Sequence, residues 1–178
     1  MKAIMRLVVA SFVAAIVVTA AATPANVKEP PKQKTSEKAG SASGTFELSG
    51  GSIPIRHAVA VTRPAHDHPG GFDFLVLLSA GPVAAEAIGG AKSMDDVRAD
   101  GTKHMTGVVA LIRQGLDPWV ELRHPTVAGQ VGVTASFVPT ATTADRIAGR
   151  LSGQTDHNGK PVKFDVTFDA PVIRRLPK

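Results

Sequence analysis

The chain has no cysteine, and this absence excludes several kinds of structure and chemistry. Disulfide bonds cannot form, although exported domains often depend on them. Lipid attachment through an N-terminal cysteine and nucleophilic catalysis by a thiol are excluded for the same reason. The chain beyond residue 44 is about 130 residues long, so it can bury a hydrophobic core large enough to hold the fold without cross-links.

Aromatic residues are scarce, because the chain has no tyrosine, one tryptophan and seven phenylalanines. Proteins that bind carbohydrates or single-stranded nucleic acids usually present several flat side chains for stacking. The single tryptophan, Trp119, starts an expected strand and is interpreted as a core anchor in preference to a rim contact. The phenylalanines beyond the N-terminal segment fall on apolar strand positions and are also interpreted as core: Phe46, Phe72, Phe74, Phe137, Phe164 and Phe168.

A concentrated charge of one sign is missing from the main part of the chain. The formal net charge is +5, but Lys2 and Arg6 lie in the first 22 residues, and residues 23–44 contribute a net +2. Residues 45–178 carry 14 basic and 13 acidic side chains, interspersed along the sequence. Nucleic-acid binding depends on a basic patch that releases counterions, so we expect no nucleic-acid partner.

Residues 1–22 have the pattern of a secretory signal peptide. Lys2 and Arg6 precede an uncharged, mostly apolar run, Leu7–Val18, and small residues allow cleavage after Ala22. The apolar run is shorter than the roughly 20 residues of a comfortable membrane span. We therefore expect a periplasmic or secreted protein with no stable membrane span after cleavage. The alternative is that the segment stays uncleaved as an N-terminal anchor.

Residues 23–44 are rich in proline, lysine, serine and glycine, with no large apolar side chain after Val27. Such a segment buries too little surface to offset the entropy lost on ordering. We expect a disordered linker here, followed by a β-rich globular domain at 45–178.

The dominant pattern after residue 44 is a series of short strands separated by turn residues. Val162–Ala170 alternates apolar and polar residues, as in a half-buried antiparallel strand. Asn158-Gly159, just before it, is a preferred two-residue hairpin turn. Phe72–Ser79 is apolar on both faces after Asp73, which places it in the middle of a sheet. The remaining expected strands lie around Phe46–Leu48, Ile53–Thr62, Met105–Arg113, Trp119–His124, Gln130–Val138 and Arg146–Ser152.

The connection between Ala80 and Lys103 has a different composition, with several alanines and few β-branched residues. Ser93 followed by Asp96 resembles the N-terminal cap of a helix. We expect one or two short helices that cover one end or edge of the sheet. The predicted fold is thus mainly β, a single antiparallel β-sandwich or barrel of about eight strands with a short helical insertion between the third and fourth strands.

The most chemically distinctive stretch is Ala65–Phe74, AHDHPGGFDF. His66, Asp67 and His68 form a candidate metal site for zinc or copper, the only cofactors that the sequence raises. Two histidines are too few for a closed zinc site. Asp67 and Asp73 are nearby oxygen donors, and His57, His104 and His124 are possible third ligands if the fold brings one of them to this end. His57 shares a predicted face with Ile53 and Val59, which favours a hydrogen-bonded core position. The alternative interpretation of the loop is an exposed polar turn.

Other patterns that carry chemistry are absent or weak. Ser79 lacks the G-x-S-x-G context of a nucleophilic serine and is interpreted as structural. Asp95 and Asp96 are neighbours on an expected helix, so their side chains do not face each other as a catalytic pair would. The glycines of AIGGA, Gly89 and Gly90, are interpreted as a helix end.

These observations favour an exported, non-enzymatic β domain that has a binding or structural role, with an unknown protein or small ligand as its partner. The first alternative is a metal-binding or metal-dependent protein that uses the His66-Asp67-His68 loop. The second is a carrier of a small apolar ligand. It predicts an internal cavity lined by residues such as Val59, Leu78, Val109 and Phe164.

Overall fold

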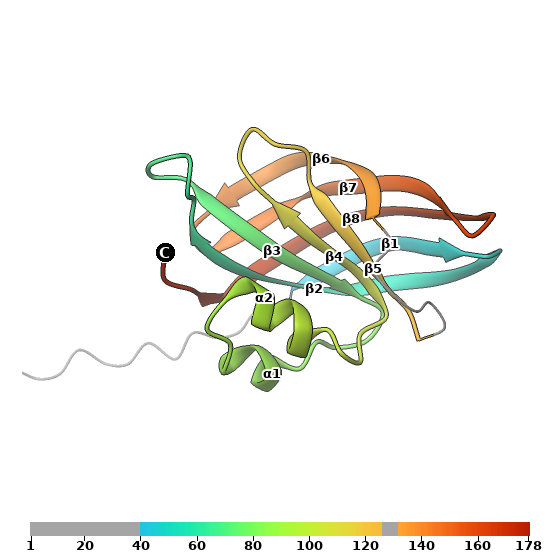
Figure 1. The fold of residues 1–178 in the computed structure, drawn as a ribbon, viewed down its shortest axis with the longest axis horizontal. Coiled ribbons are helices and arrows are strands. Elements are labelled where there is room, and N and C mark those ends of the chain that lie inside the picture. Colours follow the sequence, from blue (N-terminus) through green and yellow to red (C-terminus); the bar gives the residue numbers. More distant parts are fainter. Residues whose placement is uncertain (1–39, 126–131) are drawn as a thin grey trace, which may run out of the picture. The chain divides into compact units, whose positions relative to one another are not determined.

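The computed structural model describes residues 40–125 and 132–178, and these form a closed antiparallel barrel of eight strands (Figure 1). The expected signal peptide and most of the expected linker lie outside the described residues. The strands follow the chain order around the ring: β1 (Ser41–Leu48), β2 (Gly51–Pro64), β3 (Phe72–Ser79), β4 (Gly107–Ile112), β5 (Trp119–Arg123), β6 (Gly132–Thr143), β7 (Arg146–His157) and β8 (Lys160–Arg175).

The ring closes between the first and last strands. β1 lies between β2 and β8 and is antiparallel to both. Because β1 is short, β2 and β8 also pair directly, in parallel, between Ala60–Thr62 and Val172–Arg175. This closure decides between the two architectures that the sequence left open, in favour of the barrel. β1 begins at Ser41, so the last four residues of the predicted linker, 41–44, are part of the sheet.

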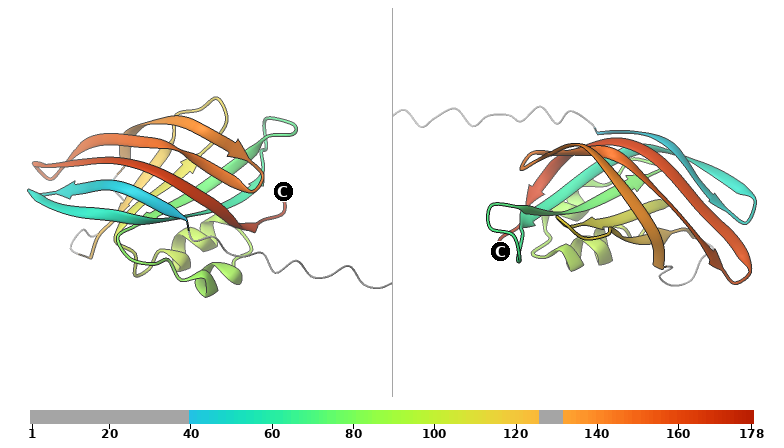
Figure 2. Two further views of the ribbon diagram at one scale, coloured as in Figure 1. Left: turned by 180° about the vertical axis from the view of Figure 1, so that it is seen from behind. Right: turned by 90° about the horizontal axis from the view of Figure 1, so that it is seen from above.

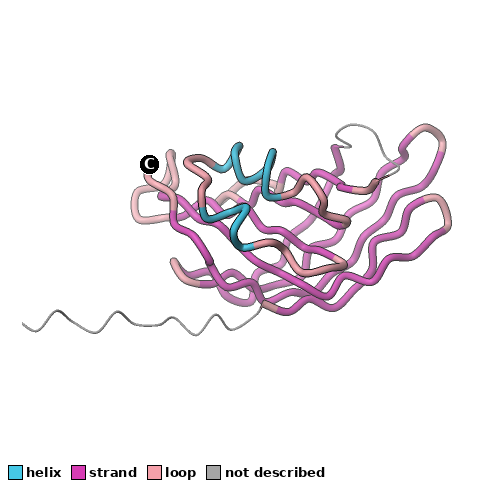
Figure 3. Tube along the Cα trace, turned by 90° about the horizontal axis from the view of Figure 1, so that it is seen from below, coloured by secondary structure: helices cyan, strands magenta, loops and turns pink. Residues whose placement is uncertain are grey.

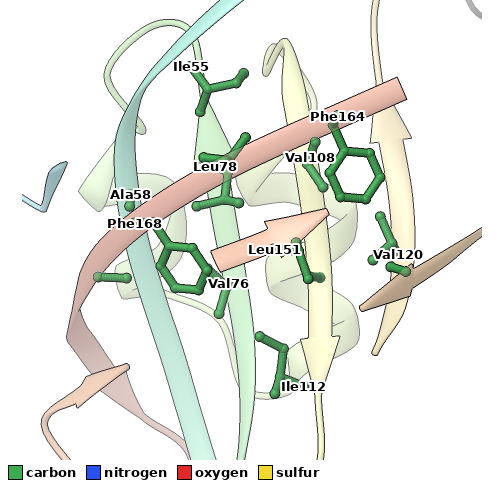
Figure 4. Packing of buried hydrophobic residues seen from close by; sticks show 14 of the residues in the cluster. Ile55, Ala58, Val76, Leu78, Val108, Ile112, Val120, Leu151, Phe164 and Phe168 are labelled. Atoms are coloured by element: carbon green, nitrogen blue, oxygen red, sulfur yellow. The ribbon is translucent and has the colours of Figure 1, made fainter. Parts of the chain in front are cut away.

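The barrel interior is filled by the inward-facing side chains of all eight strands. Figure 4 shows part of this core, in which Leu78, Val108 and Phe164 lie close together. Phe164, Val166 and Phe168 lie inside, which confirms the alternation predicted for β8. Asn158 and Gly159 both have positive φ, 55° and 74°, as the predicted hairpin turn between β7 and β8 requires.

A second apolar cluster lies outside the ring, where the insertion between β3 and β4 covers the sheet (Figure 3). The insertion consists of α1 (Ala85–Gly89), α2 (Met94–Asp96) and a π-helical turn, η1 (Val97–Gly101), that continues α2. Ser93 and Asp96 form the expected capping box. The insertion covers the outer face of β2–β4, not an end or edge as predicted, and this cover explains why β3 is apolar on both sides. No helix in the two described ranges is long and apolar enough to span a membrane.

Two predicted positions differ from the structure. Along β2, Ile55 faces the interior, but the next inward residues are Ala58 and Ala60, so the alternation changes phase near His57. His57 is half-buried on the same outward phase as Val59, and it is not a core histidine. Trp119 is not a core anchor, because it lies on the outer side of β5, with the Arg98 guanidinium 5.3 Å from its ring centroid.

Candidate functional site

Three connections meet at one end of the barrel, which we call the mouth. Neighbouring strands are antiparallel, so the β2–β3 loop (65–71), the β4–β5 loop (113–118) and the β6–β7 turn (144–145) all lie at this end. The β1–β2 and β7–β8 hairpins extend side by side from the opposite end (Figure 2). The mouth is therefore the place where loop side chains can converge.

A cavity of about 700 Å³ opens at the mouth. This volume lies within the range of roughly 300–1,000 Å³ that small-molecule sites occupy. Its apolar lining includes Phe72, Phe74, Ile112, Leu116, Pro118, Ala135, Phe137 and Pro139, and its polar lining includes Arg113, Gln114, Asp117, Ser136 and Thr142. The lining therefore combines apolar and polar side chains in similar proportion, so the site can contact both an apolar group and a polar one.

The cavity exists because β6 separates from β5. Within the described residues the two strands pair at three positions, from Trp119 with Thr134 to Glu121 with Gly132. The next position would place Pro118 opposite Ala135, and proline has no N–H to donate to the ladder. Beyond this point β7 is the one described strand that pairs with β6, up to Thr143. The β4–β5 loop and the second half of β6 become the two walls of the cavity.

The ring of Phe137 fits into this wall because residue 149, on the neighbouring strand β7, is a glycine. Its ring stacks on Phe168, with ring centroids 5.8 Å apart and an interplanar angle of 21°. A Cβ atom at Gly149 would lie 2.6 Å from the Phe137 ring and 2.4 Å from the Val138 carbonyl oxygen. Contacts this short are repulsive, so the side chain missing at Gly149 makes room for the ring.

The histidine loop borders the cavity through Gly70 and Gly71, and the lining includes neither His66 nor His68. His68 Nε2 lies 3.8 Å from the Cβ position of Gly115, a residue of the cavity wall. His66 Nδ1 lies 2.7 Å from Asp67 Oδ1, and the two side chains are 81% and 74% exposed. The hydrogen bond with His66 holds the pKa of the Asp67 carboxyl below its usual value, and the nearby positive charge acts in the same direction.

His66, Asp67 and His68 do not form a metal-binding arrangement in the part of the chain that the structure describes, and none of the histidines predicted as third ligands lies beside them. Within residues 40–125 and 132–178, no three His, Cys, Asp or Glu side chains are arranged to hold a metal ion. The candidates for a third ligand belong to the opposite end of the barrel: His57 pairs with the last residue of β3, His104 precedes β4, and His124 follows β5.

The residues proposed for an internal cavity do not share one. Leu78 and Phe164 pack inside the barrel, whereas Val59 and Val109 belong to the outer cluster under the insertion. The prediction of a cavity between these four residues is wrong, because the sheet itself separates the two pairs. Ser79 has a structural setting, since its hydroxyl donates to the Thr106 carbonyl at 3.4 Å.

Sequence reasoning missed the mouth cavity. Its walls come from the β4–β5 loop and from β6, which are far apart in sequence. The available signals were Pro118 before one strand and Pro139 within another, since proline interrupts pairing between strands. Sequence reasoning also missed Glu121, which is 1% exposed on the outer side of β5.

Comparison of the chain with protein-family models, curated proteins and solved structures finds no match.

Proposed function

We propose that this protein is an exported binding domain without catalytic activity, and that its barrel mouth binds a small apolar or aromatic group. The observation that carries the proposal is the cavity of about 700 Å³ at the point where β6 separates from β5. Export is inferred from the pattern of residues 1–22, and the lack of catalysis from the weak chemical motifs of the sequence.

The polar lining supports an apolar ligand that carries a polar end. Phe72, Phe74 and Phe137 provide flat surfaces within the cavity, while Arg113 and Asp117 lie in its loop wall with opposite charges. An aromatic or branched group would be removed from water among the phenylalanines, and its polar end would stay near the loop. Such burial is worth about 25 cal/mol for each Å² of apolar surface.

The test uses N-phenyl-1-naphthylamine, an uncharged dye that becomes fluorescent in apolar sites. Two exposed apolar side chains provide a matched pair of variants, because Leu116 (52% exposed) lines the cavity and Val138 (61% exposed) does not. We expect the dye to bind, Leu116→Ser to weaken binding by about tenfold through lost apolar contact, and Val138→Ser to leave it unchanged.

Gly149→Ala provides a second test from inside the site, because the added methyl group would displace both the Phe137 ring and the Val138 carbonyl of the cavity wall. We expect this variant to bind the dye more weakly than the parent protein at a temperature where circular dichroism shows both to be folded. Absence of dye binding, or equal losses in Leu116→Ser and Val138→Ser, would overturn the proposed function.

A further inference from the structure

One edge of the second half of β6, which we call the free edge, pairs with no strand in residues 40–125 and 132–178. In antiparallel strands, the backbone N–H and C=O groups of successive residues point alternately to the two neighbouring strands. The carbonyl oxygens of Thr134 and Val138 lie against β7, at 2.8 Å and 2.4 Å from the Cβ positions of Gly153 and Gly149. The backbone groups of Ala135 and Phe137 therefore point away from β7, towards the side that β5 has left.

This free edge is short and bounded by proline. Pro118 stands where β5 would otherwise continue opposite Ala135, and Pro139 follows Phe137 by two residues. A register shift in the β6–β7 pairing follows Pro139. Proline and bulges at edges prevent long strands from pairing there, so the edge admits a short segment and not the full strand of a second copy.

The free edge and the cavity are continuous, because Ala135 and Phe137 line the cavity. Directly paired residues of adjacent antiparallel strands present their side chains on the same face of the sheet. Ala135 and Phe137 face the interior, so a residue paired with Phe137 would direct its own side chain into the mouth. The peptide residues before and after it would place their side chains on the outer face of the sheet, beside Val138.

We propose that the mouth binds an extended peptide segment, which adds to the edge of β6 and places one bulky apolar side chain in the cavity. This inference rests on the proposed function and specifies its ligand class. Strand addition supplies affinity through main-chain hydrogen bonds and specificity through a side-chain pocket. It also assigns a role to Val138, an exposed apolar side chain on the outer face of this strand.

The experiment measures displacement of N-phenyl-1-naphthylamine by synthetic pentapeptides of the form Thr-Val-X-Val-Thr, with Phe, Leu, Ile or Trp at the centre. We expect at least one peptide to displace the dye. A methyl group on the central peptide nitrogen should weaken binding by at least about tenfold, because that N–H faces β6. A methyl group on the nitrogen of an adjacent valine points away from β6 and should have a much smaller effect.

Val138→Ser separates the two proposals, because it should weaken the peptide while leaving the affinity for the dye unchanged. Dye binding without displacement by any peptide, or equal effects of the two methyl groups, would overturn the peptide proposal and leave the proposed function standing. Failure of the dye to bind would overturn the proposed function itself. Concentration-dependent dimerisation that blocks the peptide, measured by sedimentation, would identify a second copy as the occupant and overturn the peptide proposal.

Discussion

The ion pair between Glu121 and Arg123 tests how burial changes the contribution of an ion pair to the free energy of unfolding. Arg123 Nη2 lies 2.6 Å from Glu121 Oε1, and the side chains are 28% and 1% exposed. Arg123 Nη2 also donates a hydrogen bond to the Arg98 carbonyl at 3.2 Å. The contact with Arg123 is an ion pair without hydrogen-bond geometry, and no donor in the described ranges forms a hydrogen bond with either carboxylate oxygen of Glu121. Arg123 is therefore the main compensation for this buried charge.

Replacing Arg123 with methionine should therefore be costly. Removing one partner of a buried pair leaves an uncompensated charge and typically destabilises a protein by about 3–5 kcal/mol. The double variant Glu121→Leu/Arg123→Met removes both charges, and its stability should be close to that of the parent or up to about 4 kcal/mol higher. Glu121→Gln should have a smaller effect than Arg123→Met, because the Arg123 side chain reaches water and the Glu121 side chain does not.

Urea unfolding at pH 7, followed by circular dichroism and extrapolated linearly, measures these free energies. The matched control is Arg150→Met, which breaks a bidentate pair with Asp165 on the exposed surface and should change stability far less. A cost for Arg123→Met below about 1 kcal/mol, the range of exposed pairs, would refute the reasoning. So would a double variant as unstable as Arg123→Met alone.

The remaining predictions concern the stability of the fold at acid pH and the packing of Leu176 under the insertion. The hydrogen bonds from Arg150 lower the pKa of Asp165 below 3.8, so its contribution is present above that value and is lost as the pH falls through the folded-state pKa. Asp165→Asn should therefore lower the melting temperature at pH 7, and the difference should shrink below about pH 4; a difference independent of pH would contradict this. Leu176 is 4% exposed within the outer cluster, so Leu176→Ala should cost about 2–5 kcal/mol in urea unfolding. Lys178→Ala, at the exposed chain end, is the control, and equal effects of the two would refute the packing argument.

Several elements were predictable because their causes are local. The turn at Asn158-Gly159 follows from two adjacent residues that tolerate positive φ, and the cap at Ser93 follows from a side chain three residues from its partner. The burial of β3 on both faces follows from its apolar residues, which pack against the barrel core on one side and the insertion on the other.

Other features could not be predicted because they depend on contacts between distant segments. The phase change near His57 accompanies an irregular register between β1 and β2, in which Ser41 pairs with His57 and Gly44 with Ile55. A strict period of two, read along β2 alone, therefore assigns His57 to the wrong face. Trp119 was misplaced because the insertion supplies an outer cover, including Arg98, that its own strand does not reveal.

In the candidate site, too, the features with local causes were predictable and those that depend on distant segments were not. The sequence directed attention to His66-Asp67-His68, and the structure places the end of that loop, Gly70-Gly71, at the rim of the cavity. The walls of the cavity were not visible, since Ile112 and Phe137 are brought together only when the ring closes. The metal hypothesis for the loop stays a prediction, with zinc titration of the tag-free protein as its measurement.

The sequence by itself determined where the strands lie, which of their faces are apolar, and where the chain turns or begins a helix. These features depend on residue type, alternation and short-range sterics, which act within a few neighbouring positions. Only the tertiary structure decided that the sheet closes into a barrel, that the insertion covers its outer face, and that β6 leaves β5 to open the mouth. Each of these depends on which distant strands pair, and that choice reflects packing and hydrogen bonding summed over the whole domain.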